Sequence, residues 1–258
     1  MKQVTVTETK TFSGQGPLLI AKVVSGVRQG FRQIGDAEDL SLALKTTVNE
    51  MKEHTSGQRG LLRREETDKG MDVSFKLHST MDDDNLAMAM RASYEKKAAG
   101  TVTEEAHLAF AGCIVPTRYI SITDDNTLIV KSGDGLTTYD KGDDYTVYDH
   151  GIEIVEGGAI GTADTGSGVA IQIAYGYAAQ TIFQGLTEAA AEYCLRFEGM
   201  NTADDNKPVV VEVFKVGTDV LKQFGMIVDK STPFEISGSA IMDTSRTTGS
   251  KFYELIKG

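Results

Sequence analysis

The sequence predicts a mainly β protein with one short helix and one long polar hairpin. Three observations predict it. Apolar and polar residues alternate with a period of two in several segments, as in a strand with one buried face. Glycine is common (27) and proline is scarce (4), as in sheets joined by glycine turns. Short polar turn sequences also recur through the middle third of the chain.

Two segments in the first third of the chain predict strands. Residues 71–78, MDVSFKLH, give the clearest signal because their apolar side chains share one face: Met71, Val73, Phe75 and Leu77. Residues 39–48 alternate as well, with Leu40, Leu42 and Leu44 on one side.

The connection between these two strands, residues 49–70, is long and heavily charged. Both of its arms can extend the flanking strands, which predicts one β-hairpin with its tip near residues 55–60, TSGQRG. We interpret the hairpin as a contact with a neighbouring molecule through a mixed charge cluster. The residues of this predicted contact are Glu53, His54, Arg59, Arg63, Arg64, Glu65 and Glu66. A plain solvated face is the alternative interpretation.

Residues 77–90, LHSTMDDDNLAMAM, predict a helix over about residues 80–92. Ser79 or Thr80 is the expected N-cap, and the aspartates at positions 82–84 then fall in the first turn, where the helix dipole favours negative charge. The stripe expected to pack on the sheet is Leu86, Ala89 and Met90. Adjacent helical residues point about 100° apart, so the three aspartates do not converge on a metal ion.

The middle third, residues 119–178, contains many short strand-like runs separated by turns such as TDDN, SGDG, KGDD and DHG. It is either an inserted β lobe or part of one sheet system in a single domain of residues 1–258. The glycine-rich stretch 157–168 lacks the spacing of a phosphate loop and is expected to be a hairpin loop.

Four more strands are expected towards the C-terminus. Residues 191–199 place Tyr193, Leu195 and Phe197 on one face. The other three strands are expected at residues 208–216, 224–229 and 233–243.

The composition limits the class of protein. A chain of 258 residues with 40% hydrophobic content can bury a sizeable core, and a net charge of −11 argues against a surface that grips nucleic acid. Cys113 and Cys194 are expected to be buried, reduced thiols. No apolar run approaches the roughly 20 residues that span a bilayer, and residues 1–12 lack the apolar core of a signal peptide. We expect no membrane anchor, and folding in a cytoplasm.

The sequence offers no credible active site. A Walker loop and a nucleophile elbow are both absent, and the acidic stretches 123–127 and 141–144 are typical of backbone turns. The histidines are scattered: His54, His78, His107 and His150. We therefore predict no catalytic residues, no metal site and no cofactor, and a structural or binding role.

Stretches along most of the chain match one known family in their order and spacing. They include FRQIGDAEDLSLALKTTVNEMKEHTSG (31–57), VSFKLHSTMDDDNLAMAM (73–90), TVTEEAHLAFAG (101–112), GDDYTVYDHGIEIVEGGAI (142–160), YGYAAQ (175–180), EYCLRFEGMNTADDNKPVVVEVFKV (192–216) and ISGSAIMD (236–243). Together they resemble the major tail tube proteins of long-tailed, non-contractile bacteriophages. The first dozen residues and the hairpin tip are the segments least covered.

The resemblance implies an antiparallel β-sandwich or barrel with a helix on its flank. It implies that six copies form a ring, that the rings stack into a tube, and that the tube holds a tape-measure protein and later passes the phage DNA. Tail-tip and terminator proteins are the other implied partners, and the virion tail is the implied location. The hairpin at 49–70 lies where such proteins reach a neighbouring subunit or ring.

Acidic charge suits a conduit for DNA, because a lumen that repels phosphates does not trap the genome. Six copies would carry 6 × −11 = −66 charges per ring. The sequence leaves the lumen-facing residues undetermined, although Asp72, Lys76 and Glu198 lie on the polar sides of predicted strands.

Two other classes of function stay open. A phage surface or decoration protein, or an adhesin-like β binding protein, fits the turn-rich segment 119–178. A carbohydrate-active enzyme would need two carboxylates about 5 to 9.5 Å apart in a cleft. The chain has no tryptophan to supply an aromatic platform for that enzyme.

Overall fold

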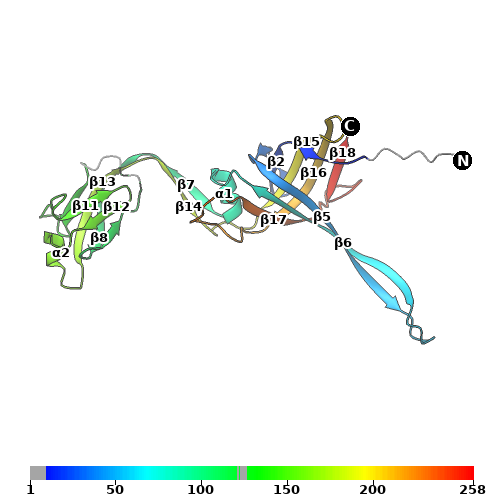
Figure 1. Cartoon of the computed structure of the whole chain (residues 1–258), viewed down its shortest axis with the longest axis horizontal. Coiled ribbons are helices and arrows are strands. Elements are labelled where there is room, and N and C mark those ends of the chain that lie inside the picture. The colour runs from blue at the N-terminus through cyan, green and yellow to red at the C-terminus, as the bar shows by residue number, and fades with distance from the viewer. Residues whose placement is uncertain (1–9, 121, 123–126) are drawn as a thin grey trace. The chain divides into compact units, whose positions relative to one another are not determined.

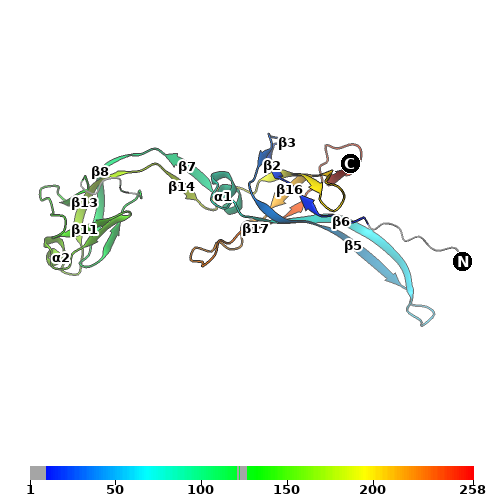
Figure 2. The same ribbon diagram turned by 45° about the horizontal axis from the view of Figure 1, so that its top comes forward.

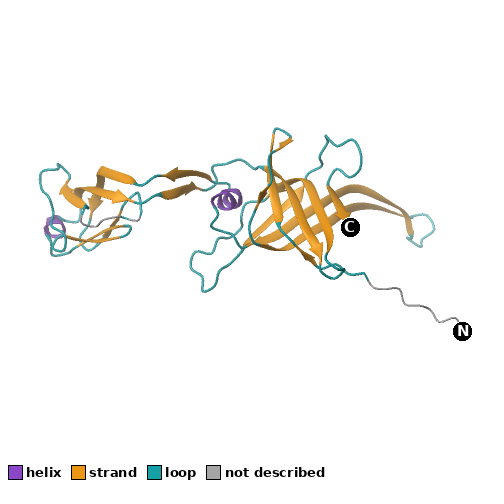
Figure 3. Ribbon diagram, turned by 90° about the horizontal axis from the view of Figure 1, so that it is seen from above, coloured by secondary structure: helices purple, strands orange, loops and turns teal. Residues whose placement is uncertain are grey.

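The structure, a computed structural model, describes residues 10–120, 122 and 127–258. These residues form antiparallel β-sheets with two short helices, which confirms the predicted fold class as mainly β with a short helix (Figure 3). The chain divides into two compact units. Unit 1 comprises Met1–Ser93 with Gln184–Gly258, and unit 2 comprises Tyr94–Phe183.

Unit 1 is built around a ten-stranded sheet. Its strands run in the order β3-β2-β15-β16-β17-β6-β5, while β1 pairs with β15, β4 with β2, and β18 with β16. The strands are β1 (Gly14–Gln15), β2 (Leu18–Val24), β3 (Val27–Arg28), β4 (Arg32–Gln33), β5 (Ala37–Lys52), β6 (Leu61–Leu77), β15 (Glu192–Asn201), β16 (Lys207–Thr218), β17 (Phe234–Ala240) and β18 (Tyr253–Lys257). Strands from the two ends of the chain thereby become neighbours, as β2 and β15 do (Figure 1).

The strand predicted at residues 71–78 is the core half of β6. Its apolar side chains are buried as predicted: Met71, Val73, Phe75 and Leu77. β17 pairs with this half of β6 from Asp72 to Leu77, so the core half has neighbours on both edges.

The face predicted for residues 39–48 is only partly right. Leu40 and Leu42 are half-buried, but Leu44 is 66% exposed. The reason is the extent of the sheet: Ala43 pairs with Asp72, the last residue of β6 that β17 reaches. Beyond this point β5 and β6 pair only with each other in the part of the chain that the structure describes, so Leu44 has no core to enter there.

The face predicted for residues 191–199 is interrupted by an irregularity. The pairing of β15 with β16 shifts between Tyr193 and Leu195, and Cys194 and Leu195 are therefore buried in succession. Tyr193 and Phe197 are only half-buried.

The strands predicted at 208–216 and 233–243 are present as β16 and β17, but the strand predicted at 224–229 is wrong. These residues belong to the connection between Thr218 and Phe234. Their apolar run resembles a buried strand, yet no neighbouring strand pairs with it in the described structure.

Helix α1 (Asp83–Met90) begins later and is shorter than predicted. Asp82 is the N-cap, since its side chain accepts a hydrogen bond from the backbone N–H of Asn85 at 3.1 Å. Ser79 is not the cap because its hydroxyl accepts a hydrogen bond from the Asp36 N–H. The helix ends at Met90, because Arg91 takes a left-handed conformation with φ of 48°.

The packing face of α1 differs from the predicted stripe at one position. Leu86 and Ala89 are buried as predicted, whereas Met90 is half-buried and Met88 is buried in its place. Asn85 is fully buried beside them. Its amide nitrogen donates to the carbonyl oxygens of Ile34 (2.8 Å) and Ser79 (3.0 Å), which ties the helix to two loops.

Unit 2 contains two three-stranded sheets and one strand pair. The sheet orders are β10-β13-β8 and β11-β12-β9, and β7 pairs with β14. The elements are β7 (Ser93–Lys97), β8 (Gly100–Ala109), β9 (Ile114–Pro116), β10 (Ile129–Ser132), β11 (Tyr145–Tyr148), β12 (Gly151–Ile154), α2 (Ala159–Ala163), β13 (Val169–Tyr177) and β14 (Gln180–Gln184). Both sheets supply side chains to one apolar core, which includes Val130, Ile152, Ile154, Ile171 and Ile173.

The segment 119–178 lies wholly in unit 2, which also includes β8 and part of the β7–β14 pair. The expected turn at 141–144 is present, and its Asp144 carboxylate accepts backbone hydrogen bonds from Asp140 (2.8 Å) and Ala159 (2.6 Å). The loop expected at 157–168 is wrong in one respect: it contains α2, whose start Asp144 holds. The turn expected at 123–126 lies outside the described residues.

The prediction that both cysteines are buried is half right. Cys194 is buried, whereas Cys113 is exposed in the turn that joins β8 to β9, and both are free thiols. Neither described helix is long enough to cross a bilayer.

Candidate assembly surfaces

The β5–β6 hairpin has arms with which no other described strand pairs. β5 and β6 pair from Ala37 opposite Leu77 to Lys52 opposite Leu61, which confirms the long hairpin. From residue 43 to residue 69 no side chain is buried. Figures 1 and 3 show the arms extending beyond the rest of the sheet of unit 1. A two-stranded hairpin is at best marginally stable alone in water, so these arms are suited to ordering against a partner.

The arms mix exposed apolar side chains with ion pairs. The exposed apolar residues are Leu44 (66%), Met51 (56%), Leu61 (56%) and Leu62 (64%). Arg63 pairs with Glu65, and Arg64 lies 3.8 Å from Glu50 across the arms. Such exposed pairs contribute little to stability, so the exposed apolar area is the main unsatisfied feature of the arms.

The hairpin tip is organised by Glu53. Its carboxylate accepts hydrogen bonds from Ser56, through both the hydroxyl (2.5 Å) and the backbone N–H (2.6 Å), and from Thr55. These bonds, those from Ser56 first, lower the pKa of Glu53 to about 2. Glu53 was predicted as a contact residue, but its charge is engaged within the tip.

The other predicted contact residues lie along the same hairpin. Glu66 lies 3.8 Å from Lys69, while His54 and Arg59 are exposed at the tip. The structure therefore brings all seven predicted residues onto one hairpin. The structure also reveals the exposed apolar residues of the arms as part of this surface. Only one of them, Leu44, was singled out from the sequence, as a position on a predicted strand face.

A second surface is the polar face of β17, β6 and β5. Cross-strand register aligns Ser41 with Ser74 and Ser74 with Ser237, and Ser239 lies opposite Asp72. Short hydroxyl side chains therefore cover the side of these strands opposite the core.

Charges on this polar face are paired. Asp72 pairs with Lys45 and accepts a hydrogen bond from Ser239 at 3.0 Å, and these contacts lower its pKa. Lys76 lies 2.7 Å from Asp39, which raises the pKa of Lys76. Two of the three residues considered for a lumen, Asp72 and Lys76, thus lie on one face and are both neutralised there.

A family model described as protein of unknown function UCP028589 matches residues 11–256. The chain belongs to this family. No curated protein matches the chain. The match runs through both units, so the hairpin, the polar face and unit 2 all fall within the region that defines the UCP028589 family.

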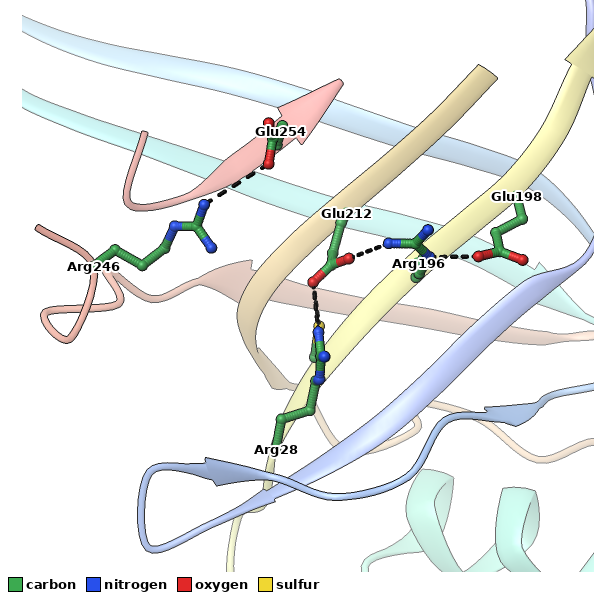
Figure 4. Close-up of polar contacts among 7 residues, drawn as sticks. Arg28, Arg196, Glu198, Glu212, Arg246 and Glu254 are labelled. Atoms are coloured by element: carbon green, nitrogen blue, oxygen red, sulfur yellow. Dashed lines mark hydrogen bonds and ion pairs between the residues drawn. The ribbon is translucent and has the colours of Figure 1, made fainter. Parts of the chain in front are cut away.

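In this UCP028589 member, ion pairs also join side chains of β3, β15 and β16 (Figure 4). The Glu212 carboxylate pairs with the guanidinium groups of Arg28 (2.7 Å) and Arg196 (2.5 Å). Arg196 also pairs with Glu198 at 2.6 Å. These pairs raise the pKa of Arg196, and the hydrogen bond to Glu198 has the largest effect. Both carboxylates are neutralised by arginine, so neither is placed as a free acid or base.

Unit 2 holds the arrangement most like an acid–base cluster. The Glu105 carboxylate accepts the Tyr175 hydroxyl at 2.5 Å and the Arg118 N–H at 2.9 Å, and it lies 2.8 Å from Nε2 of His107. Burial first, and then this bond to Glu105, raise the pKa of Tyr175 to about 12. The cluster joins β8, β13 and the segment after β9, which is a structural task. Among the described residues, no group of three or more acidic, histidine or cysteine side chains is placed to hold a metal ion.

Proposed function

We propose that this chain is a structural subunit of a bacteriophage tail tube, assembling into stacked hexameric rings around a channel for the genome. The observation that carries the proposal is the β5–β6 hairpin. Its arms expose four large apolar side chains, and no third strand pairs with them among the described residues. A free monomer gains nothing from this element, whereas an assembly can bury it against a neighbouring copy.

Open sheet edges support closure between copies. In the described structure β5 pairs only with β6, and β18 only with β16, so both strands leave one edge unpaired. Unpaired edges invite strand addition, and closing several sheets into one barrel removes them. The main strand order ends at β5 on one side and at β3 on the other, and a ring of identical copies needs an open edge at each end of the sheet.

The polar face of β17, β6 and β5 suits the wall of a channel. Serine hydroxyls and neutralised ion pairs offer DNA phosphates no cluster of free cations. Tight phosphate binding comes from cations that displace counterions, so this face would let DNA slide past without holding it.

The test removes the hairpin arms without disturbing the core half of the hairpin. Thr46 and Lys69 are cross-strand partners, so replacing residues 47–68 with Asn-Gly joins them by a two-residue turn. We expect this variant to fold and to form no tubes in negative-stain electron microscopy, while the parent chain forms stacked rings with a central hole.

The matched control shortens only the tip. Lys52 pairs with Leu61, so replacing residues 53–60 with Asn-Gly keeps both arms and their apolar side chains. We expect this variant to keep assembling, with weaker tubes. If the variant without arms forms normal tubes, the exposed arms are not needed for assembly. The proposal then loses its main support.

The second candidate is a phage surface or decoration protein, or an adhesin-like binding protein. Unit 2 favours it, because this unit has a core of its own and needs no other part of the chain to bury that core. The same micrographs separate the two functions. Compact monomers or trimers in place of stacked rings would favour decoration or adhesion.

A further inference from the structure

The connection between β16 and β17, residues 219–233, displays three consecutive apolar side chains. Met226 is 77% exposed, Ile227 is fully exposed and Val228 is 51% exposed. The base of this β16–β17 loop is fixed. The Leu221 N–H donates to the Ala89 carbonyl at 2.8 Å, and the Phe224 ring packs edge-on against Phe234 at 5.2 Å between centroids.

A groove with an apolar floor lies elsewhere in unit 1. Its volume is about 960 Å³, and its apolar walls come from β5, β15, β16 and β18. We call it the β18 groove, and its principal apolar residues are Leu40, Leu42, Phe197, Val209, Val211 and Leu255. Leu255 remains 55% exposed, so nothing in the described chain covers this part of the floor.

The loop and the groove lie at opposite ends of β16. The groove contacts Val209 and Val211, near the start of the strand, while the loop leaves after Thr218. Thr218 lies 218 − 211 = 7 positions after Val211, a separation of about 24 Å at the rise of a strand. Figure 2 shows the loop beside β17 at one end of unit 1 and the C-terminus at the other. Because Leu221 and Phe224 hold the loop at its own end, it does not fold back into its own groove.

The rims of the two surfaces have matching charges. Lys10, Lys207 and Lys257 line one side of the groove, where Asp204 pairs with Lys207 at 2.7 Å and leaves this side with an excess of basic residues. The β5 side is acidic and carries Asp36, Glu38 and Asp39. In the loop, Asp229 and Lys230 directly follow the apolar triplet. An acidic and a basic residue beside the triplet can therefore meet a basic and an acidic rim, which favours one orientation of docking.

We propose that the β16–β17 loop of one copy seats Met226, Ile227 and Val228 in the β18 groove of a second copy. The contact is heterologous, so each copy keeps one loop and one groove free and the assembly can propagate. It deepens the proposed tail tube function, on which it rests for the identity of the repeating assembly. β5 forms one wall of the groove and continues into the exposed hairpin, so both contacts would share one partner surface.

The test is a cross-link between separately produced chains. Cys113 is exposed and is first replaced by serine, whereas Cys194 is buried and stays. Ile227→Cys in one chain and Leu255→Cys in a second, tagged chain are mixed under assembling conditions and oxidised mildly. We expect a disulfide between the two chains at least tenfold above the control. The control pairs Leu255→Cys with Leu136→Cys, whose native leucine is 85% exposed in unit 2.

Three outcomes would overturn the contact. The first is no cross-link above the Leu136→Cys control. The second is a cross-link within one dilute chain that carries both Ile227→Cys and Leu255→Cys. The third is a cross-link that forms only after residues 1–9 are removed, which would make the N-terminal segment of the same chain the occupant.

A charge substitution separates this contact from the proposed function. Ile227→Asp should fold normally, since the side chain is fully exposed, and should lower the amount of assembled protein at least tenfold. Tubes formed at the parent level by Ile227→Asp would overturn the docking contact and leave the tube proposal standing. A cross-link between copies without any tubes would support the docking contact and contradict the proposed tail tube function.

Discussion

At the scale of single residues, Asn85 shows how a polar side chain can organise a core. It is fully buried in α1 and donates two hydrogen bonds, to the carbonyls of Ile34 and Ser79. Buried carbonyls left without a donor cost free energy, so this one amide fixes the helix against two separate loops. The sequence marks position 85 only as the residue after three aspartates, because its partners are brought to it by the tertiary fold.

Replacing Asn85 with leucine should lower the free energy of unfolding by about 1–3 kcal/mol, since both carbonyls would lose their donor. Urea denaturation followed by circular dichroism measures this change. Met81→Ala is the control, because Met81 is 74% exposed and should shift stability by less than about 0.5 kcal/mol. An unchanged midpoint for Asn85→Leu would mean that the two hydrogen bonds give no net stability, because Asn85 Oδ1 is buried without a partner and its removal offsets their loss.

The two thiols should differ sharply in reactivity. Burial first, and then the nearby Glu212 carboxylate, raise the pKa of Cys194 to about 11, whereas Cys113 is exposed. Only the thiolate reacts, so an alkylating reagent at pH 8 should modify Cys113 alone in the folded protein and both thiols in denaturant. Mass spectrometry of the labelled peptides reads this out, and rapid native labelling of Cys194 would contradict the burial of β15.

Glu53 makes a pH prediction for the hairpin tip. Its pKa is lowered to about 2, so its hydrogen bonds to Ser56 and Thr55 contribute fully above the ordinary glutamate pKa of 4.5. That contribution is lost as the pH falls from about 4.5 towards 2. The carboxyl carbon of Glu53 in an NMR titration should show a midpoint near 2. A midpoint near 4.5 would mean that the tip contacts do not persist in solution.

At the scale of elements, the sequence predicts the buried face of a strand best where other strands flank the segment with the alternating pattern. The core half of β6 follows its alternation because β5 and β17 flank it. Leu44 has the same pattern but lies beyond β17, so its exposure depends on where another strand ends. The run at 226–228 has strand-like residues, but none of the described strands pairs with it.

The candidate assembly surfaces were predictable from the sequence to different degrees. The charged hairpin could be located from its composition and turn residues, and its seven predicted contact residues do lie together. The polar face of β17, β6 and β5 could not be located, because aligning Ser41, Ser74 and Ser237 requires the strand order. The β18 groove likewise needs β5 and β18, which are distant in sequence, to form its walls.

If the polar face lines a channel, adding cations to it should slow DNA. Ser74 is exposed on this face, and Ser74→Lys places one new charge per copy around the channel. We expect assembled tubes of this variant to retain double-stranded DNA at low salt and to release it as salt rises. Leu136→Lys in unit 2 is the control for charge alone. Equal retention by both variants would show that this face is not the wall.

At the scale of the whole molecule, the candidate assembly surfaces all belong to one of the two units. Unit 1 contains the hairpin, the open edges of β5 and β18, the polar face and the groove. Unit 2 buries a core between its own two sheets and is entered and left through the paired strands β7 and β14. This division was left open by the sequence, because short strands and turns look alike in a lobe and in a larger sheet.

Removing unit 2 should therefore leave assembly intact. Replacing residues 98–179 with a flexible Gly-Ser linker of about six residues joins β7 to β14 and keeps all of unit 1. Unit 1 retains its buried residues in this variant, such as Leu77, Leu195 and Val213, so it should unfold cooperatively. We expect it to form tubes in negative-stain micrographs. The arm-less variant described above, with residues 47–68 replaced, should keep a folded unit 2 and form none. If unit 1 folds without unit 2 but forms no tubes, unit 2 is needed for any assembly. That result would favour the decoration or adhesion alternative.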